Sequence, residues 1–232
     1  PTVPYIEIKD IEDLKSVNTN FFPAILKTRK LGYDGKGQYI VNSSKEIPEI
    51  PKNDYILEKK INLQQEISII AVRYQDGTIF TYQPIENVHK DQILFKSYSP
   101  ANSNQSIIEE AKNHAVNFAK KISYVGTFCL EFFITDKNEL LLNEIAPRVH
   151  NSGHLTIESY NVSQFESHLR SVCDLEKIKP ILRYKSEMTN ILGEDIYNYR
   201  DKEFKKDEYF HDYFKKESKI GRKMGHFTKI HA

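Results

Sequence analysis

The chain has 232 residues, of which 39% are hydrophobic and 12% aromatic, and its 33 basic and 32 acidic residues leave a formal net charge of +1. A chain of this length and composition can bury a sizeable core in one large or two small domains. The balanced charge excludes a global field that would attract nucleic acid or a membrane surface, so any anion binding must be local. No apolar run has the length that a membrane span requires.

The N-terminal part of the chain is expected to form short strands around a glycine-rich loop. An extended segment at 4–8 comes before a short helix from Asp10 to Val17, for which Asp10 is the expected N-cap. Apolar content predicts three strands, at 23–27, 39–41 and 55–58. A soft boundary near residue 63 separates this small lobe from a larger one.

Longer elements are expected after the boundary. The Asp76-Gly77 turn joins two strands, and apolar spacing predicts an amphipathic helix that Ser106 can cap. The expected elements, in chain order, are strands at 66–74 and 78–84, a helix at 106–122, strands at 127–134 and 139–145, a helix at 163–172, and short strands with charged turns from 183 on.

The two cysteines, Cys129 and Cys173, belong to no metal-binding or redox motif. Thiols without such a motif are typical of reduced, structural cysteines in a reducing compartment. We therefore expect a cytoplasmic protein that binds neither nucleic acid nor a membrane. The chain begins with Pro1 rather than Met, and we expect it to be a piece of a longer protein.

The loop from Gly32 to Gln38 carries three glycines, which free the backbone to turn its N–H groups toward an anion. Its spacing matches neither the Walker loop nor the dinucleotide fingerprint. Lys27 ends the preceding strand, close enough to place its ammonium on the same phosphate. An ordinary hairpin turn beside a solvated lysine is the alternative interpretation.

The hairpin expected after the long helix brings two acids to one face. If a four-residue loop closes it with Ile134 opposite Glu139, Glu144 lies one diagonal step from Glu131, about 7–8 Å away at the backbone. Two carboxylates in apolar surroundings repel each other unless a cation or a proton lies between them, and Mg²⁺ with phosphate oxygens as further ligands is the natural occupant. A one-residue change in loop length would put the acids on opposite faces, with one facing solvent.

The segment from Asn143 to His154 places an acid, an arginine, two histidines, an asparagine and a serine directly after an apolar strand. A carboxylate can hold a cation, a guanidinium can grip a phosphate, and the other side chains can orient a polar substrate. Alone, the segment could be a polar loop after a buried strand. With the lysine, the glycine loop and the acid pair, it predicts a nucleoside triphosphate bridged to Mg²⁺.

In these features the chain resembles the ATP-grasp superfamily and, more closely, the N5-carboxyaminoimidazole ribonucleotide synthetases of bacterial purine biosynthesis. The resemblance implies an α+β fold: a small and a larger ATP-grasp lobe with mainly antiparallel sheets flanked by helices, and a small C-terminal β subdomain. The expected domains are 1–63, 64–182 and 183–232. The stretches that carry the resemblance are 27–29, 32–38, 58–66, 84–89, 124–126, 143–154, 163–170 and 221–226.

The resemblance also implies a reaction. ATP phosphorylates bicarbonate to carboxyphosphate, which delivers its carboxyl group to the exocyclic amine of 5-aminoimidazole ribonucleotide, and ADP and phosphate are released. The implied cofactors are ATP and Mg²⁺, and the full-length protein is expected to be a homodimer. A closed loop would keep water away from the short-lived intermediate.

The site residues follow from the same resemblance. Lys27 and Arg148 would stabilise charge that moves between carboxyphosphate and ADP, and Glu131 and Glu144 would bind Mg²⁺. The residues implied for ATP are Lys27, Gly32, Tyr33, Asp34, Gly35, Lys36, Gly37, Gln38, Glu58, Lys59, Lys60, Ile61, Glu66, His89, Asn143 and Glu144. Those implied for the ribonucleotide are Tyr33, Asp34, Arg148, His150, Asn151, Ser152, Lys215 and Arg222.

The chain departs from the family in two respects. Family members carry an additional N-terminal domain of about a hundred residues, and Lys219-Ile220 stands where they often have Arg-Pro. His89 could instead be a surface turn residue, and Lys215 could belong to a solvated charged run. Formate-dependent glycinamide ribonucleotide transformylase, biotin carboxylase and a nucleotide-binding fragment without catalysis are the alternative functions.

Overall fold

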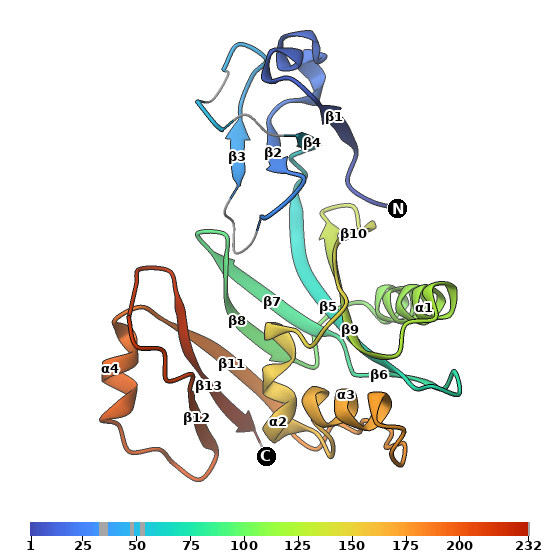
Figure 1. Cartoon of the computed structure of the whole chain (residues 1–232), viewed down its shortest axis with the longest axis vertical. Coiled ribbons are helices and arrows are strands. Elements are labelled where there is room, and N and C mark those ends of the chain that lie inside the picture. The colour runs from blue at the N-terminus through green and yellow to red at the C-terminus, as the bar shows by residue number, and fades with distance from the viewer. Residues whose placement is uncertain (33–36, 47–48, 52–53, 232) are drawn as a thin grey trace. The chain divides into compact units, whose positions relative to one another are not determined.

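The computed structural model describes residues 1–32, 37–46, 49–51 and 54–231 (Figure 1). By its internal contacts the chain divides into two compact units. The first unit comprises Pro1–Leu63 with Asp91–Ile93, and the second comprises Gln64–Lys90 with Leu94–Ala232.

The first unit is built on an antiparallel sheet in the order β1-β4-β2-β3. The strands are β1 (Tyr5–Ile8), β2 (Ala24–Thr28), β3 (Gln38–Val41) and β4 (Tyr55–Lys59). The apolar residues of these strands pack around Leu14, which is fully buried. The expected strands are therefore confirmed, and their burial explains why they read as apolar runs.

The short helix predicted after β1 is a 3-10 helix, η1 (Ile11–Ser16), and a second one, η2 (Thr19–Phe21), follows it. Asp10 is the N-cap, as expected: its side chain accepts a hydrogen bond from the Glu12 backbone N–H at 3.0 Å. The Asp13 carboxylate in turn accepts from the Asp10 backbone N–H at 3.0 Å. This reciprocal capping box satisfies N–H groups that a short helix leaves without partners.

The turn before β3 requires glycine at one position. Gly37 has a φ of +81°, and a Cβ placed on it would lie 2.4 Å from the Thr28 Cγ2. Its carbonyl accepts a hydrogen bond from the Thr28 N–H at 2.9 Å, which joins β2 to the end of the loop. Any side chain at position 37 would therefore be strained both in its backbone conformation and by contact.

The second unit is built on a larger sheet, whose main path in the described part of the chain runs β10-β9-β5-β7-β8-β11-β13-β12, with β6 paired to β5. Every pairing with an assigned register is antiparallel. The strands are β5 (Leu63–Arg73), β6 (Ile79–Thr81), β7 (Ile85–Lys90), β8 (Ile93–Ser99), β9 (Gly126–Thr135), β10 (Leu140–Ala146), β11 (Lys185–Leu192), β12 (Glu208–Asp212) and β13 (Lys223–His231).

Helices flank this sheet. α1 (Gln105–Ile122) packs against β6, β9 and β10, and α3 (Gln164–Val172) packs against β9 (Figure 1). Shorter helices complete the unit: η3 (Asn151–Leu155), α2 (Thr156–Ser159) and α4 (Asp195–Arg200). The predicted α+β fold of antiparallel sheets and flanking helices is confirmed.

Strand β9 separates the core from the candidate site because its side chains alternate between two faces. Phe128, Leu130 and Phe132 point into the core that the small residues of α1 cover. Cys129 lies in a second buried cluster on the other face, and by alternation Glu131 shares that face. The helix side of the strand therefore supplies stability, and the opposite side can carry functional groups.

The helix expected at 163–172 is α3, and Ser163 is its N-cap rather than its first residue, accepting a hydrogen bond from the Glu166 N–H at 3.1 Å. The prediction that Ser106 caps α1 was wrong: the N-cap is Asn104, whose Oδ1 accepts from the Ser106 N–H at 3.1 Å. Asn is as good a cap as Ser, and the helix simply begins one residue earlier, at Gln105.

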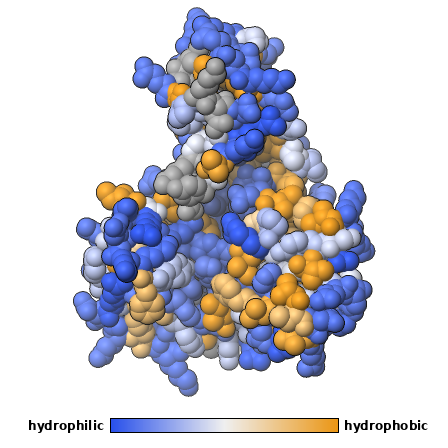
Figure 2. Space-filling model, in the orientation of Figure 1, coloured by the Kyte–Doolittle hydropathy of each residue, from blue (hydrophilic) through white to orange (hydrophobic). Residues whose placement is uncertain are grey.

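None of the described helices is long and apolar enough to cross a membrane. In the view of Figure 2 the surface is largely hydrophilic, with hydrophobic residues interspersed among charged and polar ones. An exposed apolar residue of this kind is normal for a folded chain.

Candidate functional site

The β9–β10 hairpin brings Glu131 and Glu144 together, but not by the predicted register. Ile134 pairs with Leu140 rather than with Glu139, and in a regular ladder this one-residue shift would put the two acids on opposite faces. A register irregularity between Leu142 and Glu144 compensates, so that Glu144 becomes the direct cross-strand partner of Glu131. A β-bulge at Asn143, the extra residue, therefore places the two acids on one face.

The environment of Glu131 favours its protonated form. Its side chain is 11% exposed, and burial, followed by repulsion from the Glu144 carboxylate, raises the pKa of Glu131 to about 7. His89 and Lys223 act in the opposite direction but do not outweigh these effects. A divalent cation between the two acids would relieve the same repulsion, and the all-oxygen donor pair fits Mg²⁺.

His150 faces Glu131 from the segment before η3, with 3.6 Å between its Nε2 and the Glu131 Oε1. Burial, together with the charge of Arg148, lowers the pKa of His150 to about 3. The imidazole is therefore neutral at neutral pH, and the contact does not join two opposite charges. His150 can act there as a hydrogen-bonding group rather than as a cation.

A set of buried polar contacts fixes the position of His150. The Gln164 side chain accepts from the His150 N–H at 2.9 Å and donates to its carbonyl at 2.6 Å. The His150 Nδ1 lies 2.9 Å from the Ser152 Oγ, which lies 2.8 Å from the Ser68 Oγ. Gly153 makes room for this arrangement, since a Cβ there would lie 2.7 Å from the Gln164 Oε1.

Asn151 is held by the C-terminal part of the sheet. Its amide exchanges two hydrogen bonds with the amide of Asn190 on β11, at 3.0 and 2.7 Å. Asn190 is buried and also donates to the Leu94 carbonyl at 2.9 Å. The pair fixes which way the Asn151 amide points, and it ties this loop to β11 and β8.

Glu66 on β5 and His89 on β7 form a contact between neighbouring strands, with the His89 Nδ1 2.7 Å from the Glu66 Oε2. The contact has the distance of an ion pair but not the alignment of a hydrogen bond. Burial acts to lower the pKa of His89, but the carboxylates of Glu66 and Glu131 outweigh it, so the pKa is raised. His89 therefore belongs to a cluster of charged groups and not to a surface turn.

The basic residues of the predicted ribonucleotide site lie in two places. Arg148 is exposed, and its Nη1 donates to the Val149 carbonyl at 3.0 Å. Lys215 donates to the Lys223 carbonyl at 2.6 Å, which places it beside the turn that carries Arg222. The exposed Arg222 itself donates to the backbone through Nη1.

In the first unit, Lys27 on β2 and Glu58 on β4 form an ion pair at 2.5 Å, and both side chains are largely buried. Lys59 ends β4, and Lys60 and Ile61 follow it. Gly32, Gly37 and Gln38 are the residues of the glycine-rich loop that the structure describes. The predicted contacts of Tyr33, Asp34, Gly35 and Lys36 lie outside the described residues.

Sequence reasoning did not single out several residues that shape the site. Lys223 is close enough to influence the pKa values of Glu131, His89 and His150. Gln164 and Asn190 orient the loop that carries His150, and Cys129 lies beside Glu131. The stretches around Gln164 and Lys223 did stand out as family-like, but their contacts are long-range and leave no local signal.

Comparison with known proteins supports the relationship over nearly the whole chain. The model of the ATP-grasp domain matches residues 1–165, and that of the phosphoribosylaminoimidazole carboxylase C-terminal domain matches residues 186–232. N5-carboxyaminoimidazole ribonucleotide synthase of Staphylococcus aureus strain MRSA252 is 40% identical over 98% of this chain and 62% of its own length. The synthase of Bacillus subtilis strain 168 is 39% identical over 97% and 61%. The chain thus spans less than two thirds of these relatives.

Solved structures of proteins with nearly the same name are similar to this chain as well. The N5-carboxyaminoimidazole synthetase of Staphylococcus aureus complexed with ADP matches with a TM-score of 0.89 and 36% identity, over 99% of this chain and 63% of that one. The Aspergillus clavatus synthase in complex with ADP and 5-aminoimidazole ribonucleotide matches with a TM-score of 0.90 and 30% identity, over 100% and 64%. The chain belongs to the ATP-grasp family.

Proposed function

We propose that this chain is the ATP-grasp part of an enzyme that uses ATP and bicarbonate to carboxylate 5-aminoimidazole ribonucleotide to N5-carboxyaminoimidazole ribonucleotide in purine biosynthesis. The similarity to synthases of that name extends through both matched domains and carries the proposal. The solved relatives that hold ADP, or ADP with the ribonucleotide, support the same substrates.

ATP and Mg²⁺ are the proposed cofactors. The directly opposed carboxylates of Glu131 and Glu144 would hold the cation, which supplies charge neutralisation at the phosphates. In the second unit, Asn143, Glu66 and His89 are proposed for the nucleotide. In the first unit, the proposed nucleotide residues are Lys27, Gly32 to Gln38, and Glu58 to Ile61.

The ion pair between Lys27 and Glu58 suggests how the lysine is prepared. The Glu58 carboxylate holds the ammonium in one position while no phosphate is present, so little side-chain freedom remains to be lost on binding. A triphosphate carries more negative charge than one carboxylate and can compete for the ammonium. Lys27 would then stabilise charge on the phosphates during phosphoryl transfer.

The ribonucleotide is proposed to bind along the segment from Arg148 to Ser152. The exposed guanidinium of Arg148 can grip an anion, and the neutral imidazole of His150 and the fixed amide of Asn151 can hydrogen-bond to polar groups. Ser152 is fully buried between Ser68 and His150, which supports a role in orienting the histidine. Lys215 and Arg222, which flank one turn, are proposed for the phosphate.

In the proposed chemistry, bicarbonate attacks the γ-phosphorus of ATP, and ADP leaves. The carboxyphosphate formed then transfers its carboxyl group to the exocyclic amine, which loses a proton as phosphate departs. Arg148 and Lys27 would stabilise anionic charge during both transfers. Matched residues 186–232, described as a phosphoribosylaminoimidazole carboxylase domain, favour bicarbonate over formate as the co-substrate.

Further properties are proposed on the same basis. The full-length protein is expected to be a cytoplasmic homodimer that binds neither nucleic acid nor a membrane. Residues 1–63, 64–182 and 183–232 are proposed as the small lobe, the larger lobe and the C-terminal subdomain.

Calorimetry of this chain with ATP, in the presence and absence of Mg²⁺, tests the nucleotide assignment directly. We expect binding that requires Mg²⁺ and that Lys27→Met weakens. Lys30→Met is a matched control, since Lys30 is an exposed lysine three residues further along the chain. Binding that persists without Mg²⁺, or that both variants weaken equally, would contradict the proposal.

A further inference from the structure

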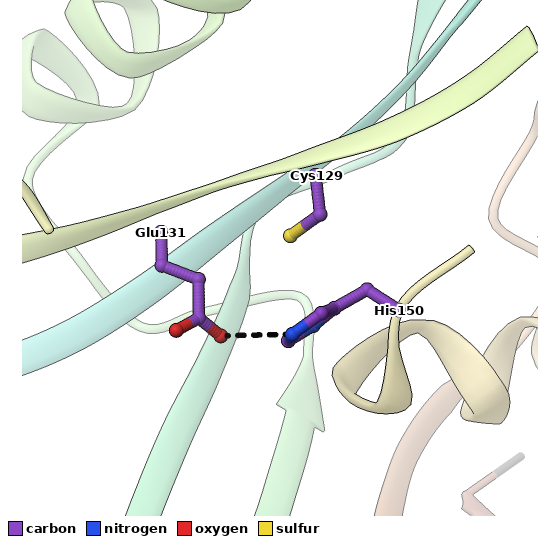
Figure 3. A group of neighbouring side chains, drawn as sticks. All are labelled: Cys129, Glu131 and His150. Atoms are coloured by element: carbon purple, nitrogen blue, oxygen red, sulfur yellow. Dashed lines mark ion pairs between the residues drawn. The ribbon is translucent and has the colours of Figure 1, made fainter. Parts of the chain in front are cut away.

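Three different donor groups converge on the site face of β9. The Cys129 sulfur, a Glu131 carboxylate oxygen and a His150 ring nitrogen all lie within 4.8 Å of one another. Figure 3 shows the three side chains pointing toward a common space, two from β9 and one from the segment before η3. Cys129 is 0% exposed, and Glu131 and His150 are each 9% exposed.

This donor set differs in kind from the carboxylate pair. Mg²⁺ prefers oxygen ligands, whereas a thiolate, an imidazole and a carboxylate together are typical of Zn²⁺ and similar ions. Bonds of about 2.0–2.3 Å to zinc require donor atoms closer together than 4.8 Å, so binding would draw the side chains inward by roughly an ångström. Glu131 and His150 already approach to 3.6 Å.

The surroundings suit a metal-bound histidine. One ring nitrogen of His150, Nδ1, lies 2.9 Å from the Ser152 Oγ, and Ser152 lies 2.8 Å from Ser68. The Ser152 backbone N–H also donates to Nδ1, at 3.4 Å. A histidine that binds a metal through one ring nitrogen usually gives its other ring N–H to a partner, so metal binding at Nε2 would require the tautomer in which Nδ1 carries the proton and donates to the Ser152 Oγ. The Nε2 atom then remains directed toward Glu131, the side on which the ion would lie.

We propose that Cys129, Glu131 and His150 form a binding site for a thiophilic divalent cation of the zinc class. The site shares Glu131 with the carboxylate pair but takes its other ligands from Cys129 and His150. An ion bound there would withdraw Glu131 from Glu144 and fix His150. Because Glu131 and His150 are proposed for Mg²⁺ and the ribonucleotide, the bound ion would inhibit the proposed reaction. That inhibition rests on the proposed function, whereas binding of the ion does not.

The alternative explanation for a cysteine at this position is that Cys129 only packs in the hydrophobic core. It belongs to a buried cluster with Ile70, Ala146 and Met188, and burial raises the pKa of its thiol well above the ordinary value. A metal that binds the sulfur must displace the thiol proton. A thiol that only packs would form no bond to a metal.

Titration of the metal-free chain with Co²⁺ distinguishes these explanations, because a cobalt–thiolate bond produces near-ultraviolet charge-transfer absorption. We expect this absorption at one ion per chain, unaffected by excess Mg²⁺ and abolished by Zn²⁺. Cys173→Ser should retain it and Cys129→Ser should lose it; these are the two cysteines of the chain, and Cys173 is exposed. Absence of the absorption from the folded chain, or its loss in Cys173→Ser alone, would overturn the proposal.

His150→Ala provides an independent test that leaves the buried thiol in place, should Cys129→Ser fail to fold. It should weaken Co²⁺ binding at least about tenfold, since loss of a ligand costs no less than loss of a supporting partner. Unchanged Co²⁺ affinity in folded His150→Ala would exclude the site. Calorimetry with ATP and Mg²⁺ on the same samples tests the proposed function separately.

Discussion

The coupled acids of the β9–β10 hairpin make the stability of the second unit depend on pH in a predictable way. Glu131→Gln keeps the shape of the side chain but removes its charge. In the folded chain, burial and the Glu144 carboxylate raise the pKa of Glu131 from 4.5 to about 7. Between these two values the folded state holds a proton that the unfolded state has lost, so wild-type stability falls as pH rises.

The magnitude follows from the pKa difference. The rise in the pKa of Glu131 from 4.5 to about 7 corresponds to about 3–4 kcal/mol, since a pKa difference of one is worth about 1.4 kcal/mol. Most of this difference, about 2–3 kcal/mol, develops between pH 5 and pH 8. Glu131→Gln should therefore differ little from the wild type at pH 5 and should be more stable at pH 8, in the absence of metal and nucleotide.

Urea unfolding at pH 5 and at pH 8, followed by hydrogen–deuterium exchange in peptides of the second unit, measures this difference in the free energy of unfolding. Because only the second unit is followed, the two units need not unfold together. Glu139→Gln is the matched control, because Glu139 is an exposed glutamate next to β10. An equal effect of Glu131→Gln at both pH values would refute the electrostatic reasoning. So would a control that shows the same pH dependence.

Three other changes test separate parts of the account. Glu144→Gln should abolish Mg²⁺-dependent nucleotide binding in calorimetry while the circular dichroism spectrum stays unchanged; retained binding would contradict the metal assignment. Asn190→Ala should raise the KM for the ribonucleotide about tenfold in the full-length enzyme, because the Asn151 amide loses hydrogen bonds worth about 1–2 kcal/mol; an effect confined to kcat would argue against this positioning role. Gly37→Ala should destabilise the first unit by at least about 1–2 kcal/mol in a thermal or urea melt, because of its positive φ and the collision with Thr28; an unchanged midpoint would show that the turn adapts.

Much of the fold could be predicted because its signals are local. Apolar spacing located α1 and most strands, and Asp10 was recognised as a cap from its side chain and the residues after it. Strands β7 and β8 were not predicted, since Ile85–Lys90 and Ile93–Ser99 mix charged and polar residues with apolar ones. Pairing with neighbouring strands stabilises them, and that information is not local.

The candidate site shows the same limit. The sequence predicted that Glu131 and Glu144 share a face, but by a diagonal register that the structure does not have. The bulge at Asn143 corrects the shift, and no periodicity in the sequence reveals a bulge. Likewise Asn190, distant in sequence from Asn151, holds its amide through two hydrogen bonds that the topology of β11 makes possible.

The measurement that tests the proposed function most directly is ADP formation by the full-length protein with ATP and Mg²⁺ as each co-substrate is varied. We expect ADP formation to require both bicarbonate and 5-aminoimidazole ribonucleotide, with one carboxylated ribonucleotide for each ADP. ADP formation that requires formate and glycinamide ribonucleotide instead, or that ignores the ribonucleotide altogether, would contradict the account.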